Sequence, residues 1–327
     1  MKSYSFYYSQ LSEEQKKVYM TIYTAWKNKQ ETVTFDIPQG WEKANIPWRI
    51  RCDHPLLFYV SKLSYTVVGK KMTLYAKFPY TNSEIDYYTS KINERIAILY
   101  NKFIKDKKTE YEKEIAIHDC LCRNVKYDND EIEIDKYDKE NHNVLGTLFG
   151  KCGVCEGFAK TFKLLCDLAK IRCLVVMGEA YTESISAQDM CGHAWNVVYV
   201  DNKPYHVDVT WDITLGHVYD YFNLTDKAIF KDHKVDDDLP IVHCNSLTYN
   251  YFYYNQMYAN SQKEFNQLYK QLLREKKESF SLKANFNFDK ENMDPLISTL
   301  DPTLLPQQMK MKYSINDKHN IIHFFFN

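Results

Sequence analysis

The sequence predicts an α+β fold. Several segments place apolar residues at the three-to-four-residue spacing of amphipathic helices. Other segments are short, rich in β-branched and aromatic residues, and joined in pairs by turn-forming residues, as in antiparallel hairpins. The chain shows no internal repeat, and its 327 residues are enough to build a substantial core.

Residues 1–108 are expected to form an N-terminal α+β region. Ser12 and Gln15 have the form of a capping box, so a helix should begin there and end near Asn28. After this helix we expect a strand at 32–37, a hairpin made of 57–68 and 72–78, and a long helix at 85–104.

Residues 109–235 are expected to form the core. The turn residues Asp201, Asn202 and Lys203 join the last two predicted strands in an antiparallel hairpin. Facing residue numbers in this hairpin should add up to about 404, so His193 should lie opposite about position 211. The predicted elements are a helix at 110–125, a polar loop at 126–143, a helix at 155–169, and strands at 171–178, 193–200 and 204–210.

Residues 236–327 are predicted to be a C-terminal α+β appendage of unknown role. The pattern favours a helix near 262–277, a strand near 280–288 and an apolar final segment at 321–326.

Composition excludes several classes of function. Lysine and arginine number 42 and aspartate and glutamate 43, so the net charge of −1 offers no cationic surplus for nucleic acid or anionic membranes. No segment approaches the ~20 apolar residues of a membrane span, and the N-terminus lacks the pattern of a secretory signal. Nine cysteines without framework spacing indicate mostly reduced thiols. We expect a cytoplasmic protein with no membrane span and no nucleic-acid partner.

Three short strings carry a cysteine, a histidine and an aspartate in that order: 153–159 (GVCEGFA), 192–196 (GHAWN) and 205–212 (YHVDVTWD). A thiol attacks an amide only as a thiolate, which a helix N-terminus and a neighbouring imidazolium both stabilise. Cys155 begins the predicted helix, so both can act on it. His193 can move the proton, and Asp208, on the neighbouring strand, can fix the orientation of the ring.

These strings resemble the motifs of the transglutaminase-like superfamily, in particular a bacterial branch with VCEGYA, HAWN and YHVDVTWD type motifs. The resemblance covers most of 1–235 and is strongest over 144–226, where it continues past the aspartate string into 221–226 (YFNLTD). It implies Cys155 as nucleophile, His193 as base and acid, and Asp208 as the residue that orients His193. It also implies a papain-like core, in which the cysteine helix packs on an antiparallel sheet.

Two positions depart from the family pattern. Phe158 stands where tyrosine is frequent, and Leu145 stands where an aromatic residue is expected. Neither belongs to the predicted triad, but both bear on the pocket that would hold the acyl group. We expect no cofactor and no metal in the site.

Other interpretations of the same residues remain open. Cys152 and Cys155 form a CxxC pair, which with Cys191 and His193 could bind zinc, or could form a redox disulfide. Zinc would consume the thiolate and the imidazole that a triad requires. His206 shares a strand face with Asp208 and is an alternative ring, although packing is the simpler explanation.

Three further residues are candidates for the oxyanion hole or the cleft: Trp195, Trp211 and Glu156. Either tryptophan could form a wall of the cleft, with core packing as the default alternative. Glu156, in the first helical turn, at least complements the helix dipole. The backbone N–H of Cys155 is a natural oxyanion donor, and the sequence does not identify the second donor.

The sequence therefore predicts a thiol-dependent acyl-transfer enzyme that acts on peptide or glutamine-type amides of a protein or peptide substrate. We favour hydrolysis, as in a cysteine protease or amidase. A transglutaminase that crosslinks proteins or transfers an amine is the alternative within the same chemistry. A non-catalytic protein-binding module on the same fold is the alternative outside it.

Overall fold

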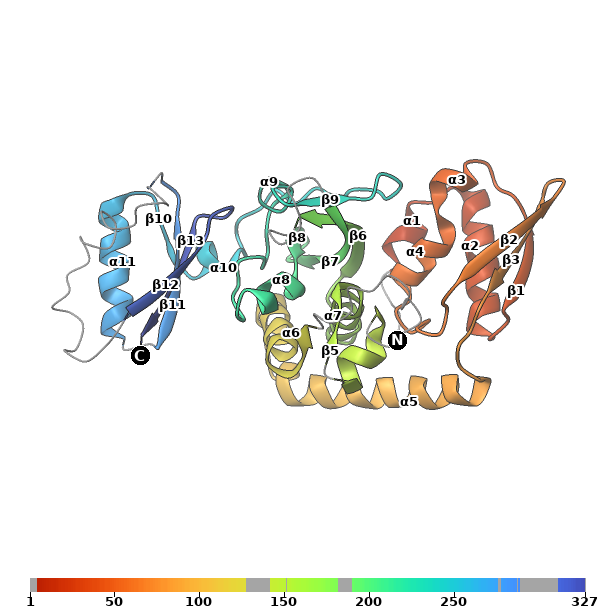
Figure 1. Ribbon diagram of the computed structural model, residues 1–327, viewed down its shortest axis with the longest axis horizontal. Coiled ribbons are helices and arrows are strands. Elements are labelled where there is room, and N and C mark those ends of the chain that lie inside the picture. Colours follow the sequence, from red (N-terminus) through yellow and green to blue (C-terminus); the bar gives the residue numbers. More distant parts are fainter. Residues whose placement is uncertain are drawn as a thin grey trace.

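The structure, a computed structural model, describes residues 5–127, 142–150, 152–181, 190–275, 278–286, 288 and 311–326. It combines helices with mainly antiparallel sheets, so the predicted α+β class is confirmed. Figure 1 shows the N-terminal elements at one end, the helix that begins at Cys155 and its sheet in the middle, and the C-terminal elements at the other end. The predicted division at residues 108 and 235 stays a prediction. Among the described residues, no helix is both long and apolar enough to cross a bilayer.

The N-terminal elements surround a three-stranded sheet. The predicted capping box is present, because the Ser12 side chain accepts from the Gln15 N–H and Gln15 returns the bond. The strand predicted at 57–68 was wrong in its first half: residues 57–60 form buried turns, closed by bonds such as Val60 N–H to Leu57 O. The elements are α1 (Phe6–Ser9), α2 (Glu13–Lys27), α3 (Trp41–Ala44), α4 (Ile46–Asp53), β1 (Thr32–Asp36), β2 (Leu63–Val68) and β3 (Lys71–Ala76), with strand order β1-β3-β2.

Two long helices lead into the core. The helix α5 (Asn82–Leu99) runs along one side from the N-terminal elements to the middle of the molecule (Figure 1) and continues as a π-helical turn over Tyr100–Ile104. The next helix, α6 (Glu110–Asn124), follows the prediction closely and begins with a capping box at Thr109. Of the loop predicted at 126–143, residues 128–141 lie outside the described residues, and Lys126–Tyr127 form the short strand β4.

The core sheet has the order β8-β7-β6-β9, and α7 (Cys155–Ala169) packs against β6 and β7. Helix α7 has the predicted bounds. Its apolar side faces the sheet, which is the arrangement that the family resemblance implies. The strands are β6 (Cys173–Tyr181), β7 (Met190–Val200), β8 (Lys203–Val207) and β9 (His233–Val235), preceded by a π-helical turn over Gly146–Gly150 and by β5 (Cys152–Gly153), which pairs with β4.

The hairpin of β7 and β8 differs from the prediction in two respects. Asn196 faces Val207, so facing numbers add up to 196 + 207 = 403 instead of 404. The strand predicted at 204–210 was wrong at its end, because Asp208 leaves the strand and caps the short helix α8 (Val209–Thr214). Its Oδ1 accepts from the N–H groups of Thr210 and Trp211. The carboxylate is therefore held at the edge of the sheet.

Strand β9 was not predicted; it follows the short helix α9 (Asp226–Ile229) and pairs antiparallel with β6. Gly178 on β6 permits this pairing. A Cβ atom there would lie 2.0 Å from the backbone oxygen of Lys234 and 2.9 Å from the ring of Trp195. Only glycine allows the two strands to approach so closely.

The C-terminal elements form a four-stranded sheet with a helix on it. The predicted strand at 280–288 ends earlier, at Ala284, and the predicted helix ends at Arg274, with 276–277 outside the described residues. The apolar final segment is a strand, β13. The elements are α10 (Tyr251–Tyr254), β10 (Tyr258–Ala259), α11 (Gln262–Arg274), β11 (Ser279–Ala284), β12 (Met311–Asn316) and β13 (Ile321–Phe326), with order β10-β11-β13-β12.

Candidate active site

Cys155 is the first residue of α7, and its side chain is partly exposed. The first intrahelical bond runs from the N–H of Phe158 to the carbonyl of Val154. The N–H groups of Cys155, Glu156 and Gly157 therefore lie in the first turn, where no carbonyl of the helix can receive them. The positive end of the helix dipole acts on the thiol at this position and favours a thiolate.

His193 lies on β7 between the thiol and a carboxylate. Its Nε2 is 2.6 Å from Oδ2 of Asp208, and the Cys155 thiol is close enough to act electrostatically on the imidazole. Burial lowers the pKa of His193, but the negative charges of Asp208 and Cys155 outweigh burial and raise it to about 10. The ring therefore holds a proton near neutral pH and can face a thiolate as an imidazolium.

Asp208 is buried and receives four hydrogen bonds. Its Oδ1 accepts from the backbone of Thr210 and Trp211, and its Oδ2 accepts from His193 and, at 3.0 Å, from Nε2 of His233. Burial raises the pKa of Asp208, but the charge and hydrogen bond of His193, followed by those of His233, bring it well below its usual range. Asp208 is consequently an anion of fixed orientation.

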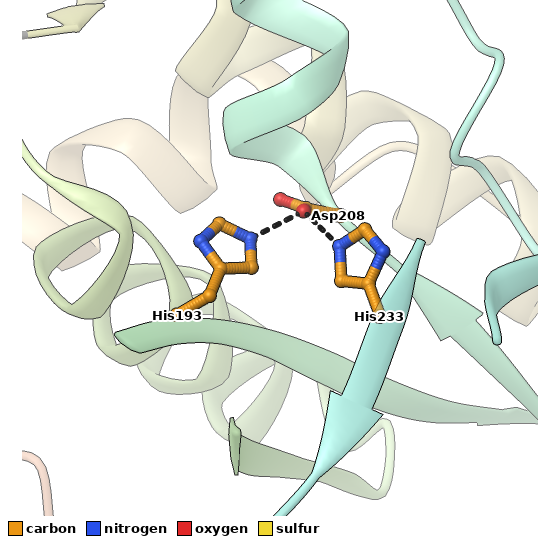
Figure 2. A group of neighbouring side chains, drawn as sticks. All are labelled: His193, Asp208 and His233. Atoms are coloured by element: carbon orange, nitrogen blue, oxygen red, sulfur yellow. Dashed lines mark hydrogen bonds and ion pairs between the residues drawn. The ribbon is translucent and has the colours of Figure 1, made fainter. Parts of the chain in front are cut away.

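Sequence reasoning missed His233, which lies on the opposite side of Asp208 from His193 (Figure 2). Its Nδ1 is 2.6 Å from Oδ1 of Asp232, and Oδ2 of Asp232 accepts the hydroxyl of Tyr221 at 2.7 Å. The only signal in the sequence was the Asp232-His233 dipeptide. The pairing of β9 with β6 brings it to the site from 25 residues beyond Asp208.

The two tryptophan candidates lie against His193 in different ways. Trp195 is buried with its ring parallel to the imidazole, at 6.1 Å and 18°, and its indole N–H donates to Nδ1 of His206. This N–H is therefore occupied and is not available as an oxyanion donor. Trp211 is only partly buried, with its ring 6.2 Å from that of His193 and 4.7 Å from that of His233, so it can form a wall of the cleft.

Glu156 points into the protein instead of toward the thiol. It is buried, with its Oε1 2.5 Å from Nζ of Lys160 and 3.3 Å from the guanidinium of Arg51. Burial raises the pKa of Glu156, but Lys160 and then Arg51 bring it below its usual value. Glu156 therefore anchors the start of α7 through an ion pair.

His206, the alternative ring, contacts a different carboxylate. Its Nε2 lies 3.0 Å from Oδ1 of Asp226, while its Nδ1 accepts the Trp195 N–H. Because Nδ1 accepts, Nε2 carries the proton and donates to Asp226. His206 thus holds the Trp195 indole in place by accepting its N–H, and is itself held by Asp226.

Two groups of described residues contain the side chains that metals prefer: His193, Asp208 and His233, and His206, Asp226 and Cys244. Neither group contains Cys155 or Cys191, the thiols of the zinc hypothesis, and the side chain of Cys152 lies outside the described residues. In the second group, a metal on Nε2 of His206 would require an imidazolate, because Nδ1 already accepts a hydrogen bond. The side chains give no support to a zinc site around Cys155.

Comparison with known proteins agrees with this geometry. Residues 98–209 match the family model of the transglutaminase-like superfamily. This segment contains Cys155, His193 and Asp208, and the resemblance predicted from the motifs is confirmed.

Individual relatives of this chain are distant. The chain is 26% identical to the human (Homo sapiens) kyphoscoliosis peptidase over 170 residues, which are 47% of this chain and 25% of the relative. The mouse (Mus musculus) kyphoscoliosis peptidase is 26% identical over 153 residues, 42% and 23% of the two chains. The chain thus spans about a quarter of the length of these relatives. A crystal structure of a TGase is similar at a TM-score of 0.31 and 15% identity, covering 46% of this chain and 44% of the other.

Proposed function

We propose that this transglutaminase-like protein is a thiol-dependent acyl-transfer enzyme with Cys155, His193 and Asp208 as its catalytic residues. The observation that carries the proposal is one continuous set of contacts. A partly exposed thiol at the start of α7 interacts electrostatically with His193, which in turn lies 2.6 Å from the anionic Asp208. A helix dipole, an imidazolium and a fixed carboxylate are the three features that activate a cysteine nucleophile.

The geometry supports a two-step reaction. In the first step the Cys155 thiolate attacks the carbonyl carbon of an amide, and His193 gives its proton to the departing amine, which leaves an acyl thioester on Cys155. In the second step His193 takes a proton from the incoming water or amine, the new bond to the carbonyl carbon forms, and the C–S bond breaks. The Cys155 N–H, in the first turn of α7, is suitably placed to stabilise the oxyanion in both steps.

We propose water as the usual acceptor, which makes the enzyme a cysteine protease or amidase with a protein or peptide substrate. The curated relatives that match about half of the chain are named peptidases. Transfer to a substrate amine, as in a transglutaminase, uses the same acyl-enzyme. It differs from hydrolysis only in that an amine, instead of water, attacks the thioester. Incubation of a glutamine-containing peptide with the enzyme in ¹⁸O water, with and without a primary amine, separates the two. ¹⁸O in the product despite the amine supports hydrolysis, and amine incorporation contradicts it.

We also place the protein in a reducing compartment, the cytoplasm. Support comes from the eight cysteines whose side chains are described, all of which are free thiols. Fractionation of the native cells would test the location, and recovery outside the cytoplasm would contradict it.

The chain supplies its own control for a direct test of the nucleophile. Cys191 is an exposed free thiol, so its alkylation reports an ordinary cysteine. With iodoacetamide at pH 6, we expect Cys155 to be alkylated at least tenfold faster than Cys191 in the same tube, as measured by peptide mass spectrometry. His193→Ala should remove this advantage. If Cys155 reacts no faster than Cys191 in the unaltered protein, the enzyme proposal is wrong and the binding module is favoured.

A further inference from the structure

The Asp208 carboxylate is shared by two imidazole rings. Its Oδ2 lies 2.6 Å from Nε2 of His193 and 3.0 Å from Nε2 of His233, one on each side (Figure 2). The proposed reaction requires only His193. The presence of a second ring on the same oxygen atom therefore calls for an explanation of its own.

His233 lies between two carboxylates. Its Nδ1 is 2.6 Å from Asp232, and its Nε2 contacts Asp208. Each ionised carboxylate accepts, so the two contacts together call for a proton on each ring nitrogen of His233, the form in which the ring is a cation. This cation is buried, and the centre of its ring is 5.2 Å from that of His193.

Three further ionisable groups nearby add no charge to this cluster of His233, Asp208 and Asp232. Burial raises the pKa of the Tyr221 hydroxyl far above its usual value, and burial lowers the pKa of His206. Burial likewise lowers the pKa of His319 to about 4. All three are thus neutral near pH 7. Lys318, on the turn between β12 and β13, lies 3.8 Å from Oδ2 of Asp232 and adds a positive charge on the far side.

The backbone fixes the position of both rings. His193 on β7 pairs with Gly178 on β6, and the opposite edge of β6 pairs with β9, which carries His233. The close approach of β9 at Gly178 leaves no room for a side chain there. The two rings are therefore attached to strands on either side of one central strand, and their separation is set by the sheet.

We propose that His233 is a positioning residue that competes with His193 for the Asp208 carboxylate and so limits how tightly His193 holds its proton. This inference rests on the proposed function, because it concerns the ring that moves protons in that reaction. Two cations that share one anion weaken each other's hold on it. In the acyl-enzyme, His193 must be neutral to take a proton from water, so an imidazole that never releases its proton would slow the second step.

Loss of the charge at position 233 should move two pH profiles in opposite directions. His193 would become more basic, so the pair of Cys155 thiolate and His193 imidazolium would survive to lower pH. Hydrolysis of the acyl-enzyme, which requires neutral His193, would need higher pH. A side chain that only stabilised the fold would lower both rates together without displacing the profiles in opposite senses.

The test uses the full chain with the variant His233→Gln, which keeps an N–H for Asp208 but removes the charge. A second variant, His233→Gln with Asp232→Asn, replaces the ion pair by two neutral amides and avoids a buried unpaired carboxylate. The matched control is His323→Gln, because His323 is also buried and also contacts a carboxylate, that of Asp220, at 3.1 Å. Iodoacetamide measures Cys155 reactivity between pH 4 and 8. The steady-state phase with p-nitrophenyl acetate measures hydrolysis of the acetyl-enzyme.

In His233→Gln we expect the acid limb of Cys155 alkylation to move down by about one pH unit and the acid limb of acetyl-enzyme hydrolysis to move up by about the same amount. In the double variant both limbs should move in the same senses by a smaller amount, because the negative charge of Asp232 is removed as well. The His323 variant should match the unaltered protein in both. If the first His233 variant does not fold, the double variant decides. Profiles that stay in place, or move in the same direction, overturn the role of His233. An unaltered protein with no Cys155-dependent acetylation instead overturns the proposed function itself.

Discussion

Among the described residues, Cys155, His193 and Asp208 can be compared with Cys122, His118 and Asp212, a second set of the same residue types in which the thiol lies elsewhere in its helix. Cys155 is the first residue of α7 and is partly exposed. Cys122 lies in the last turn of α6, is buried, and has its Sγ 3.7 Å from both ring nitrogens of His118. A helix dipole favours a negative charge at its start and opposes one at its end. The helix position therefore favours Cys155 over Cys122 as the proposed nucleophile.

The two carboxylates differ as much as the thiols. Asp208 accepts four hydrogen bonds, and the net effect of its surroundings is a pKa well below the usual range. Asp212, which contacts His118 at 3.0 Å, also accepts from the Tyr221 N–H, and these are its two side-chain bonds within the described residues. Burial raises its pKa to about 7, because the hydrogen bond and charge of His118 do not compensate and Asp220 adds repulsion. Residue type alone therefore does not identify a triad. The position in the helix, access to solvent and the number of donors do.

The largest expected difference is between the two thiols. Cys155→Ala should abolish turnover of peptide or ester substrates while leaving the thermal midpoint near that of the unaltered protein. Cys122→Ala should leave turnover and Cys155 alkylation unchanged and cost about 1 kcal/mol of stability through a small cavity. Turnover by the Cys155 variant, measured with p-nitrophenyl acetate, would contradict the assignment of the nucleophile.

The two aspartates should separate rate from stability. Asp208→Asn should reduce turnover by about 10²–10⁴, because an amide does not hold His193 in the same tautomer and orientation. Asp212→Asn should leave turnover within about twofold and lower the free energy of unfolding by on the order of 2 kcal/mol, because a buried bond to His118 is weakened. Urea unfolding beside the kinetic assay measures both. A large loss of turnover in Asp212→Asn, with little loss in Asp208→Asn, would contradict the choice of Asp208 as the residue that orients the catalytic histidine.

The structural position of the proposed nucleophile was predictable because the sequence determines it locally. The apolar side of 155–169 defines the helix and its first residue, and the turn at Asp201 and Asn202 sets the β7–β8 register to within one residue. The capping role of Asp208 was not predictable, because the alternation of Val207 and Val209 indicates a strand. His233 was not predictable either, since a three-residue strand has too little pattern, and its position depends on a pairing with β6 that Gly178 permits.

The pH dependence of turnover should report His193. Its pKa of about 10 keeps it protonated in the free enzyme over the physiological range, so turnover should fall as pH rises through about 10, where the departing amine loses its acid. The contribution of His193 to the free energy of unfolding should also fall as pH rises. A raised folded-state pKa stabilises the protein fully below about 6.5, and this contribution is lost as pH rises toward 10. His193→Ala should therefore differ most in stability below pH 6.5. An equal difference at pH 6 and at pH 10.5 would contradict this assignment.

The smallest expected effect concerns Glu114, which lies one turn from His118 on α6. It is buried, its Oε2 accepts from the Asn223 amide at 2.9 Å, and its Oε1 has no hydrogen-bond partner within the described part of the chain. Burial raises the pKa of Glu114 to about 8, which the hydrogen bond from Asn223 only partly offsets. The folded protein thus binds a proton here that the unfolded chain releases near pH 4.3, so stability falls as pH rises from about 4.3 to 8.

Glu114→Gln should remove this loss, because a neutral amide keeps an acceptor for Asn223 without a buried charge. We expect the variant to gain on the order of 2 kcal/mol over the unaltered protein at pH 8.5 and little at pH 4.5, as measured by urea unfolding at the two pH values. Cys155 alkylation should be unchanged, because Glu114 belongs to the buried group around His118 and not to the site. A gain that is equal at both pH values would indicate improved packing instead of a buried carboxylate that resists ionisation.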